Sequence, residues 1–458
     1  MADTVTLRLP TGALPYSLCL ALFEASLALF GEFYWGYGLV RLGLLALMLL
    51  FVVALRRCAP AEPRSLPGGA VIRVTLAAVL LATSLLAVRT IRQAAYAANH
   101  TNRIRLDEGR TTWVAARLLW QGENPYARGA LVDDTSYKSR LPKRLAAGIG
   151  PMIAADAVEP ELERYLLSLD PSSRAALLPA PHADAPSVAR REAALLGYKY
   201  GPVPLLITAA LGKLTGPAAV PLSNGTACLA LFAVLALVLY SAGAGLAGAG
   251  LGLAALMLDP MIGFYFMFWT ATDVWPLLFG FSALLLAMRG YSAVAGVALA
   301  LAVSSKIMPA ALFLILLPML RSWRALAAFV AACAIWMLPW IVLDARGFVN
   351  NAMLWGAIME PDTDSWVFGA PHGLVLVARA LLLVPIGILA LRLALGREPH
   401  ICSTFAVITI LVMAGGNAVH NNYVPWFETW TVLAIAEAFC FPRPLGTLIG
   451  LRRAGATA

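Results

Sequence analysis

The chain has 458 residues, of which 60% are hydrophobic and only 13% are charged, and its formal net charge is +9. Soluble proteins typically use about a quarter of their residues for charge, so this composition excludes a water-soluble globule. The cations form no basic tract interleaved with aromatic residues and no zinc-finger or RNA-binding signature, so we expect no nucleic-acid partner. Anchoring in cytoplasmic loops and contact with anionic membrane lipids explain the charge better.

Apolar runs recur along the whole chain, and several have the length of about 20 residues that crosses a bilayer as a helix. These runs are expected to cross as helices, because lone strands would leave backbone groups without partners in lipid. The sequence therefore predicts an all-α, polytopic transmembrane protein with roughly 11–13 membrane segments. The runs fall near residues 12–31, 39–56, 70–88, 201–215, 223–241, 243–258, 273–288, 292–318, 326–343, 372–394, 400–416 and 424–441.

Lysine and arginine decide the expected orientation, because they are enriched in short cytoplasmic loops. The residues placed in the cytoplasm on this basis are Arg56, Arg57, Arg64, Lys213, Arg289, Arg321, Arg324, Arg392, Arg397, Arg443, Arg452 and Arg453. Both termini are then inside. Residues 1–88 form N-terminal membrane helices, 89–200 a long external loop folded as a cap, 201–441 membrane helices with short external loops, and 442–458 a cytoplasmic tail.

Two segments do not fit a simple series of full-length membrane-spanning helices. The centre of the run 292–318, Ser304-Ser305-Lys306-Ile307-Met308-Pro309, interrupts the apolar pattern. We expect two short helices there, meeting near the outer surface at Lys306. The number of crossings between residues 216 and 272 stays open, because the stretch 259–272 is too short for a full span.

A surface helix is expected just beyond the third apolar run, beginning at Asp107. Its apolar residues at helical spacing are Trp113, Ala116, Leu119 and Trp120, which is typical of an amphipathic helix lying on a membrane. Gly122 is expected to end the helix, and Asn124-Pro125 to turn the chain. By position alone, Asp107 is an N-cap or first-turn acid that the helix dipole favours.

This stretch carries a resemblance to a known family. An acidic residue, a helix with an Ala-Ala pair and then Leu-Leu-x-x-Gly-x-Asn-Pro-Tyr (residues 118–126) resembles the first external loop of C-type glycosyltransferases. The closest similarity is to the polyprenyl-phosphate-mannose-dependent mannosyltransferases of glycosyltransferase family 87. Three further stretches resemble that family: Tyr200-Gly201-Pro202, the small-residue run from Ala295-Gly296 through Lys306 to Pro309, and the pair His420 and Tyr423.

The chain also departs from the family pattern. Its first external loop is unusually long, and Thr270-Ala271-Thr272-Asp273 stands where a Gly-Gln motif is often found. A Gly-Pro pair, Gly201-Pro202, replaces Pro-Pro at the start of the fourth apolar run. These differences bear on which sugar and which acceptor are used.

The resemblance implies an inverting glycosyltransferase in a bacterial plasma membrane with its active site facing outside. It implies transfer of a sugar, with mannose favoured, from a polyprenyl-phosphate donor to a glycolipid or polysaccharide acceptor, without a cofactor. Transfer of arabinofuranose or another lipid-linked pentose is the nearest alternative. A lipid or glycolipid transporter is the alternative from another class, and it should show paired interrupted helices in two related halves; the sequence shows one interrupted segment.

The same resemblance assigns roles to residues. Asp107 is the general base that takes the proton of the acceptor hydroxyl, and Glu108 is either its catalytic support or a first-turn dipole partner. Lys306 and His420, from the family-like stretches, are expected to contact the donor phosphate. Position alone adds Arg105 and Arg110, which flank Asp107, to the donor phosphate, and Asp273, near an outer helix end, to acceptor binding. Tyr200 and Tyr423, from the family-like stretches, are also expected to bind the acceptor or substrate.

Each assignment has a plainer alternative. A lysine in an apolar run can extend its amine to the membrane surface, an interfacial histidine can bond backbone, and arginines in a loop can simply face water. Carboxylates and a histidine also gather at Asp362, Asp364 and His372, but their spacing matches no metal-ligand pattern, so we expect no metal. Glu24 lies inside the first apolar run and is expected to face other helices.

Overall fold

The computed structural model describes residues 7–9, 13–32, 38–56, 58–60, 69–99, 107–127, 198–259, 262, 266, 270–353, 371–416 and 423–447. Most of the predicted external cap, together with Arg105, Asp362, Asp364, His420 and the C-terminal tail from residue 448, lies outside the described residues.

The described chain is helical apart from one short strand pair. Strand β1 (Leu7–Leu9) lies parallel to β2 (Cys58–Pro60). The helices of the first half are α1 (Ala13–Glu32), α2 (Gly38–Arg56), α3 (Gly69–Asn99), α4 (Asp107–Trp120), α10 (Pro202–Thr215), the short 3₁₀ turn η2 (Gly216–Ala218), α11 (Ala219–Ser241) and α12 (Gly245–Leu258). Helix α3 continues 11 residues beyond residue 88, where the first membrane region was expected to end.

The second half is also helical. Its helices are α14 (Val274–Met288), α15 (Ser292–Ser305), α16 (Ile307–Ala310), the 3₁₀ turn η4 (Ala311–Ile315), α17 (Leu316–Leu320), α18 (Trp323–Phe348), the π-helical turn η5 (Val349–Met353), α20 (His372–Ala394), α21 (Ile401–Ala414) and α22 (Val424–Phe439).

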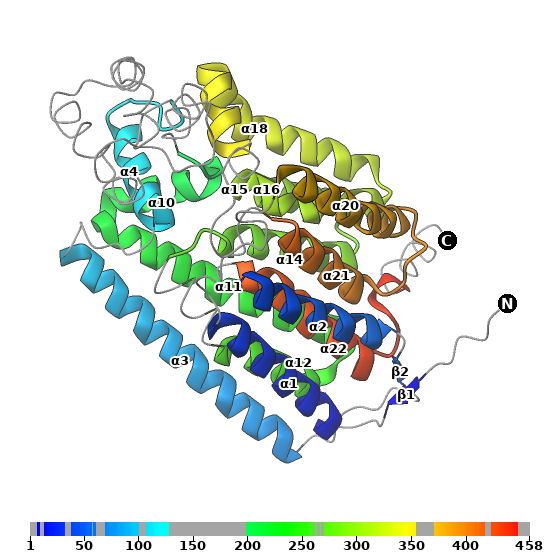
Figure 1. Ribbon diagram of the computed structural model, residues 1–458. Helices are drawn as coiled ribbons and strands as arrows, with labels where there is room; N and C mark the ends of the chain where they lie inside the picture. The colour runs from blue at the N-terminus through cyan, green and yellow to red at the C-terminus, as the bar shows by residue number, and fades with distance from the viewer. Residues whose placement is uncertain are drawn as a thin grey trace.

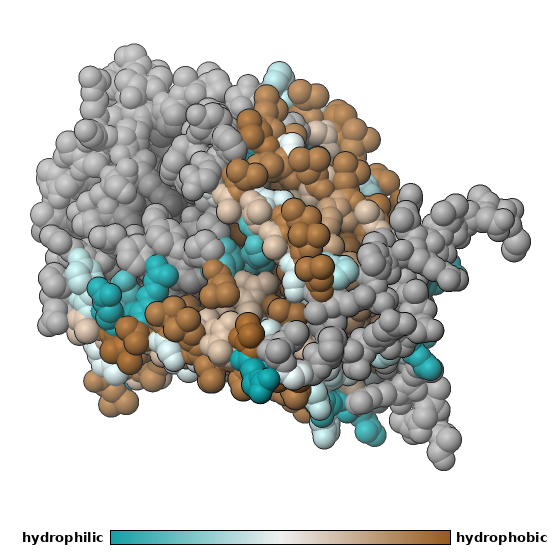
Figure 2. Space-filling model, turned by 90° about the horizontal axis from the view of Figure 1, so that it is seen from below, coloured by the Kyte–Doolittle hydropathy of each residue, from teal (hydrophilic) through white to brown (hydrophobic). Residues whose placement is uncertain are grey.

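Six of the described helical segments are long and apolar enough to cross a membrane, and shorter apolar helices lie among them. The six are Leu14–Gly31, Gly38–Arg56, Ile72–Ala98, Pro202–Ser241, Trp323–Phe348 and Gly373–Ala394. Large apolar side chains on these helices face outward: Leu47 of α2 is 63% exposed, and Ile335 of α18 is 71% exposed. Figure 2 shows apolar side chains over much of the described surface seen from below. The protein is therefore a multi-pass helical membrane protein, because lipid is the solvent in which such a surface is stable.

The helices pack side by side in one bundle (Figure 1). Helix α15 lies in the interior against α14 and α18, and α11 contacts α14, α12 and α3. At the C-terminal side, α22 packs against α21, α12, α1 and α2. Helix α4 packs on α10 at one end of the bundle.

The predicted interruption at Lys306 is confirmed. Lys306 ends α15 in an extended conformation, with φ −155° and ψ 101°. The cause lies in Pro309, which has no N–H to give and whose ring would clash with the carbonyl four residues earlier, that of Ser305. That carbonyl instead accepts the N–H of Gly201 at 2.9 Å. A side chain at Gly201 would collide with the carbonyl of Ser304, so glycine is needed for this contact.

The helix beginning at Asp107 is confirmed too, and it turns at Gly122, whose φ is +82°. Its surroundings differ from the expectation of a helix lying on lipid. Trp113 is only 8% exposed and packs with Ala97 and Val220, and Trp120 donates its indole N–H to the carbonyl of Ala209. Most of the apolar face of α4 therefore packs on α10 and its neighbours and is covered by protein, while Trp120 at its end stays 37% exposed.

Candidate functional site

The first turn of α4 is buried in the protein interior at Glu108. It is 5% exposed, and its Oε2 accepts the backbone N–H of Thr272 at 2.5 Å and the Thr272 hydroxyl at 2.9 Å. The next residue has no side chain, and a Cβ at Gly109 would collide with the Thr270 hydroxyl. The glycine thus lets the first turn of α4 approach the 270–273 segment closely enough for Glu108 to bond it.

Lys306 lies at the centre of the site. Its Nζ is 2.7 Å from Asp273 Oδ2 and 3.2 Å from Glu108 Oε1. The side chains of these two acids are 0% and 6% exposed, and that of the lysine is 10% exposed. The break after α15 is what turns the lysine toward both acids, because it takes Lys306 off the helical path.

Asp273 stands at the N-cap position of α14 and completes the cluster. Its Oδ1 accepts the indole N–H of Trp426, on α22, at 2.7 Å. The segment leading to it is strained, since Thr270 has a φ of +57°, which is unusual for a β-branched residue. Such strain persists only where surrounding contacts impose it, and it gathers at functional sites.

Two tyrosine rings flank the lysine. Nζ of Lys306 lies 5.3 Å from the ring centre of Tyr200 and 5.2 Å from that of Tyr423. Tyr200 is held by the turn after α4, because Tyr126 donates its hydroxyl to the Tyr200 carbonyl at 3.0 Å. Tyr198 extends this support, since its N–H bonds the carbonyl of Pro125 and its hydroxyl lies 3.1 Å from that of Thr112.

Burial and charge act together on the titratable groups. Burial, with a smaller contribution from the nearby Glu108, raises the pKa of the Asp273 carboxyl to about 6 against the lowering effect of Lys306 and Trp426. Burial lowers the pKa of Lys306, but the two carboxylates outweigh it and raise that pKa above its ordinary range. Lys306 is therefore a fixed positive charge, whereas Asp273 can exchange a proton near neutral pH.

The structure thus brings together five of the residues singled out in the sequence: Glu108, Lys306, Asp273, Tyr200 and Tyr423. Asp107 and Arg110 belong to the first turn of α4, but their side chains lie outside the described part of the chain, as do Arg105 and His420. His372 begins α20, and its side chain is likewise outside that part.

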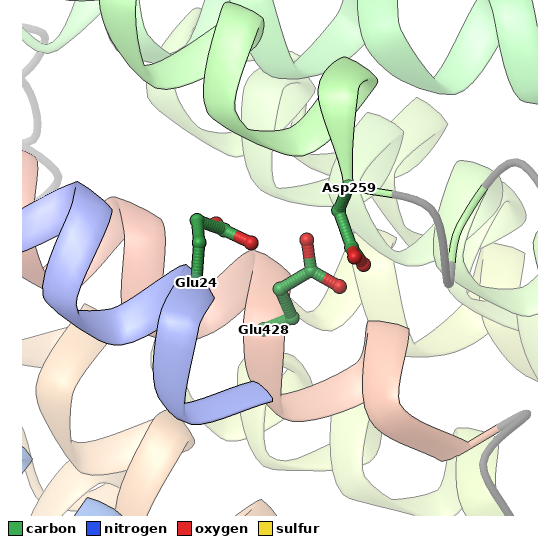
Figure 3. Close-up of side chains that lie close together, drawn as sticks. All are labelled: Glu24, Asp259 and Glu428. Carbon is green, nitrogen blue, oxygen red and sulfur yellow. The ribbon is translucent and has the colours of Figure 1, made fainter. Parts of the chain in front are cut away.

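Sequence reasoning missed two features. Trp426 gave no signal, because a tryptophan in an apolar run is ordinary for a membrane helix. Glu428 lies in the same run, and an acid in a membrane segment is costly enough to mark a site. It gathers with Glu24 and Asp259 into a second acidic cluster (Figure 3).

Comparison with protein-family models, with curated proteins and with solved structures finds no match for this chain.

Proposed function

We propose that this protein is an inverting glycosyltransferase that takes its sugar, with mannose favoured, from a polyprenyl-phosphate carrier. The observation that carries the proposal is the buried Glu108–Lys306–Asp273 cluster, built where the acidic beginning of α4 meets the broken end of α15. Three buried charges are costly in a membrane protein, and such residues are usually kept for function. The motifs that resemble glycosyltransferase family 87 contain two of the three, Glu108 beside Asp107 and Lys306 before Pro309.

Lys306 is suited to contact the phosphate of the donor. Its ammonium has three N–H donors, and the hydrogen bonds among the described residues use two of them. With both acids ionised, however, the cluster has a charge of −1, from two carboxylates and one ammonium. A lipid phosphate therefore needs further cations. We assign Arg105 and Arg110 to that role because they flank Asp107 in sequence, and His420 because it belongs to a stretch that resembles the family.

The carboxylates supply the chemistry of the acceptor. The base that takes the proton of the attacking hydroxyl is Asp107, one Cα–Cα step of about 3.8 Å from Glu108. Glu108 is held by Thr272 and Lys306, which makes it a positioning residue and leaves the base role to its neighbour. Asp273, Tyr200 and Tyr423 offer a carboxylate and two ring faces to the acceptor or the sugar.

The test uses the full chain purified into lipid nanodiscs, with a radiolabelled polyprenyl-phosphate mannose and a glycolipid extract as acceptor. Transfer of label to the acceptor, with inversion at the anomeric carbon, is the expected result. The same assay is run with a lipid-linked arabinofuranose, which replaces mannose if the pentose alternative holds. In sealed liposomes, movement of intact donor lipid across the bilayer with no cleavage of the sugar–phosphate bond would instead favour a transporter.

A further inference from the structure

A second acidic cluster lies where α1, α12 and α22 meet. Glu24 comes from α1, Asp259 directly follows α12, and Glu428 comes from the first turns of α22. One carboxylate oxygen from each residue lies within 4.8 Å of the other two. Figure 3 shows the three side chains converging from three helical segments that are far apart in sequence. Glu428 is fully buried and Asp259 is 6% exposed.

Two of these acids lack a hydrogen-bond donor among the residues that the structure describes. The carboxylate oxygens of Glu24 and Glu428 accept no hydrogen bond from a donor among the described residues, and the polar group against Glu428 is another acid, Asp259. Neither acid takes part in the ion pairs of the described chain. A carboxylate can only accept hydrogen bonds, and burying an ionised one without a donor or a cation is expensive. Within the described part of the chain, the fully buried Glu428 therefore has no hydrogen-bond donor at its oxygens, and the charged groups beside it are the acids Glu24 and Asp259.

We propose that Glu24, Asp259 and Glu428 bind a divalent metal cation of the size of Ca²⁺. Calcium takes oxygen ligands at about 2.4 Å, so two ligands on opposite sides of it lie about 4.8 Å apart. The oxygens of the cluster lie within that span of one another, so they can share one ion. Magnesium usually keeps several waters and takes only one or two protein carboxylates, so a set of three carboxylates favours calcium. Calcium takes roughly six to eight oxygen ligands, and water supplies those that the three carboxylates do not.

The position of the cluster gives the cation a structural role. Glu428 follows Trp426 by two residues, so the two side chains leave α22 about 200° apart and point to opposite sides. One side reaches Asp273 through Trp426, and the other reaches Glu24 and Asp259. A cation on the second side ties the beginning of α22 to α1 and to the end of α12. It thereby fixes the helix turn that holds Asp273. The binding itself does not depend on the glycosyltransferase proposal.

The experiment measures calcium binding directly. The full chain is stripped with chelator in nanodiscs of zwitterionic lipid, and binding of Ca²⁺ is followed by titration calorimetry and by the melting temperature. We expect one calcium per chain and a melting temperature that rises with calcium concentration, since a ligand of the folded state stabilises it. Magnesium should act only at concentrations at least tenfold higher.

Glu428→Gln and Glu24→Gln should each weaken calcium binding at least tenfold and remove the calcium-dependent rise in melting temperature. Without calcium, Glu428→Gln should melt at or above the wild-type temperature, because it removes a buried charge. Glu437→Gln is the matched control on the same helix. Its carboxylate accepts the Leu445 N–H at 2.8 Å, a bond that glutamine can keep, so calcium binding should stay at the wild-type level.

Three outcomes would overturn the proposal. Wild-type protein that binds no calcium in stoichiometric amount would show that the acids are neutralised by protons alone. Undiminished calcium binding by Glu428→Gln would place the ion elsewhere, on lipid or on the protein surface. Equal loss of binding in Glu437→Gln would mean that the effect comes from general damage to α22.

Discussion

Trp426 donates its indole N–H to Asp273 at 2.7 Å, across 153 residues of sequence, with both side chains buried. This bond makes α22 part of the candidate site, although none of the motifs that resemble the glycosyltransferase family contains Trp426. It also fixes the carboxylate of Asp273 so that the other oxygen faces Lys306 at 2.7 Å. Asp273 is thus bound from α22 and from the break after α15 at once.

Trp426→Phe tests this bond. The substitution keeps an aromatic ring and removes the donor, so a hydrogen bond to a charged group is lost, which is worth about 1.5–3 kcal/mol of unfolding free energy. In an Asp273→Asn background the same change should cost less, because the charged acceptor is gone. Trp430→Phe is the control: it loses a similar ring volume on the same helix, among Phe281 and Phe405 and away from Asp273. Chemical unfolding that shows equal costs in both backgrounds would contradict the role given to the bond.

The Lys306 ion pairs should show strong coupling in stability. Lys306→Met leaves two buried carboxylates without their cation, and we expect it to lower the unfolding free energy by roughly 3–5 kcal/mol. The double variant Lys306→Met with Asp273→Asn removes one of the stranded charges and should recover part of that loss. Thermal melting of the wild type, both single variants and the double variant measures the coupling. Simple additivity of the two single losses would mean that the lysine extends to the membrane surface and is not bound between the acids.

The pKa of Asp273 gives a pH prediction whose sign can be worked out. Its pKa is about 6 in the folded protein against an ordinary value of 3.8, so between these values the folded state holds a proton that the unfolded state has released. Stability from this group is fully present below pH 3.8 and is lost as pH rises through about 6, by about 3 kcal/mol in total. The variant Asp273→Asn lacks this dependence. The melting temperatures of the two proteins should therefore differ least near pH 4 and most near pH 7. A difference that does not change with pH would contradict the raised pKa of Asp273.

Local features of the fold could be predicted from the sequence, because they depend on neighbours along the chain. The apolar runs predict the helices, Pro309 predicts the break at Lys306, and Gly122 predicts the end of α4. Trp113 and Ala116 of α4 were assigned to the membrane surface incorrectly, because periodicity shows that a helix has an apolar face and does not show what covers that face.

The candidate site was predictable only in part. Lys306 and Glu108 were each recognised, but their contact spans 198 residues, and no local pattern records such a separation. The sequence predicted that Glu24 faces other helices. It could not predict that Asp259 and Glu428 are the residues beside it, because these three lie far apart along the chain. Several interior helices, such as α14 and α15, are also shorter than the roughly 20 residues of a full span, so counting apolar runs does not give the number of crossings.

The orientation of the chain is open to a direct test. The cation distribution predicts that residues 89–200 are external and that both termini are cytoplasmic. A cysteine introduced at Ser136 should react with a membrane-impermeant reagent in intact cells, whereas one at Ala456 should react only after lysis. The reverse pattern would put the beginning of α4 on the cytoplasmic side and remove the proposed access to a donor on the outer face.

The base of the proposed reaction is tested by comparing two adjacent acids. Asp107→Asn should fold normally, because asparagine caps a helix about as well as aspartate. It should bind the donor lipid and yet transfer sugar about 100- to 10,000-fold more slowly, the usual contribution of a general base. Glu108→Gln should cost far less in rate, because glutamine can still accept the two bonds from Thr272; its main effect should be a lower melting temperature from the weakened contact with Lys306.

Sugar transfer, donor binding and melting temperature are therefore measured together for both purified variants. The combination separates a base from a helix cap. Loss of a cap lowers the melting temperature and leaves the transfer rate of the folded fraction unchanged. Loss of the base lowers the transfer rate and leaves the melting temperature unchanged. If Asp107→Asn is folded, binds donor and transfers sugar at the wild-type rate, Asp107 is only a cap. The proton would then have to go to Glu108 or Asp273, and of the two Asp273 is the better placed, because its pKa of about 6 lies nearer to neutral pH.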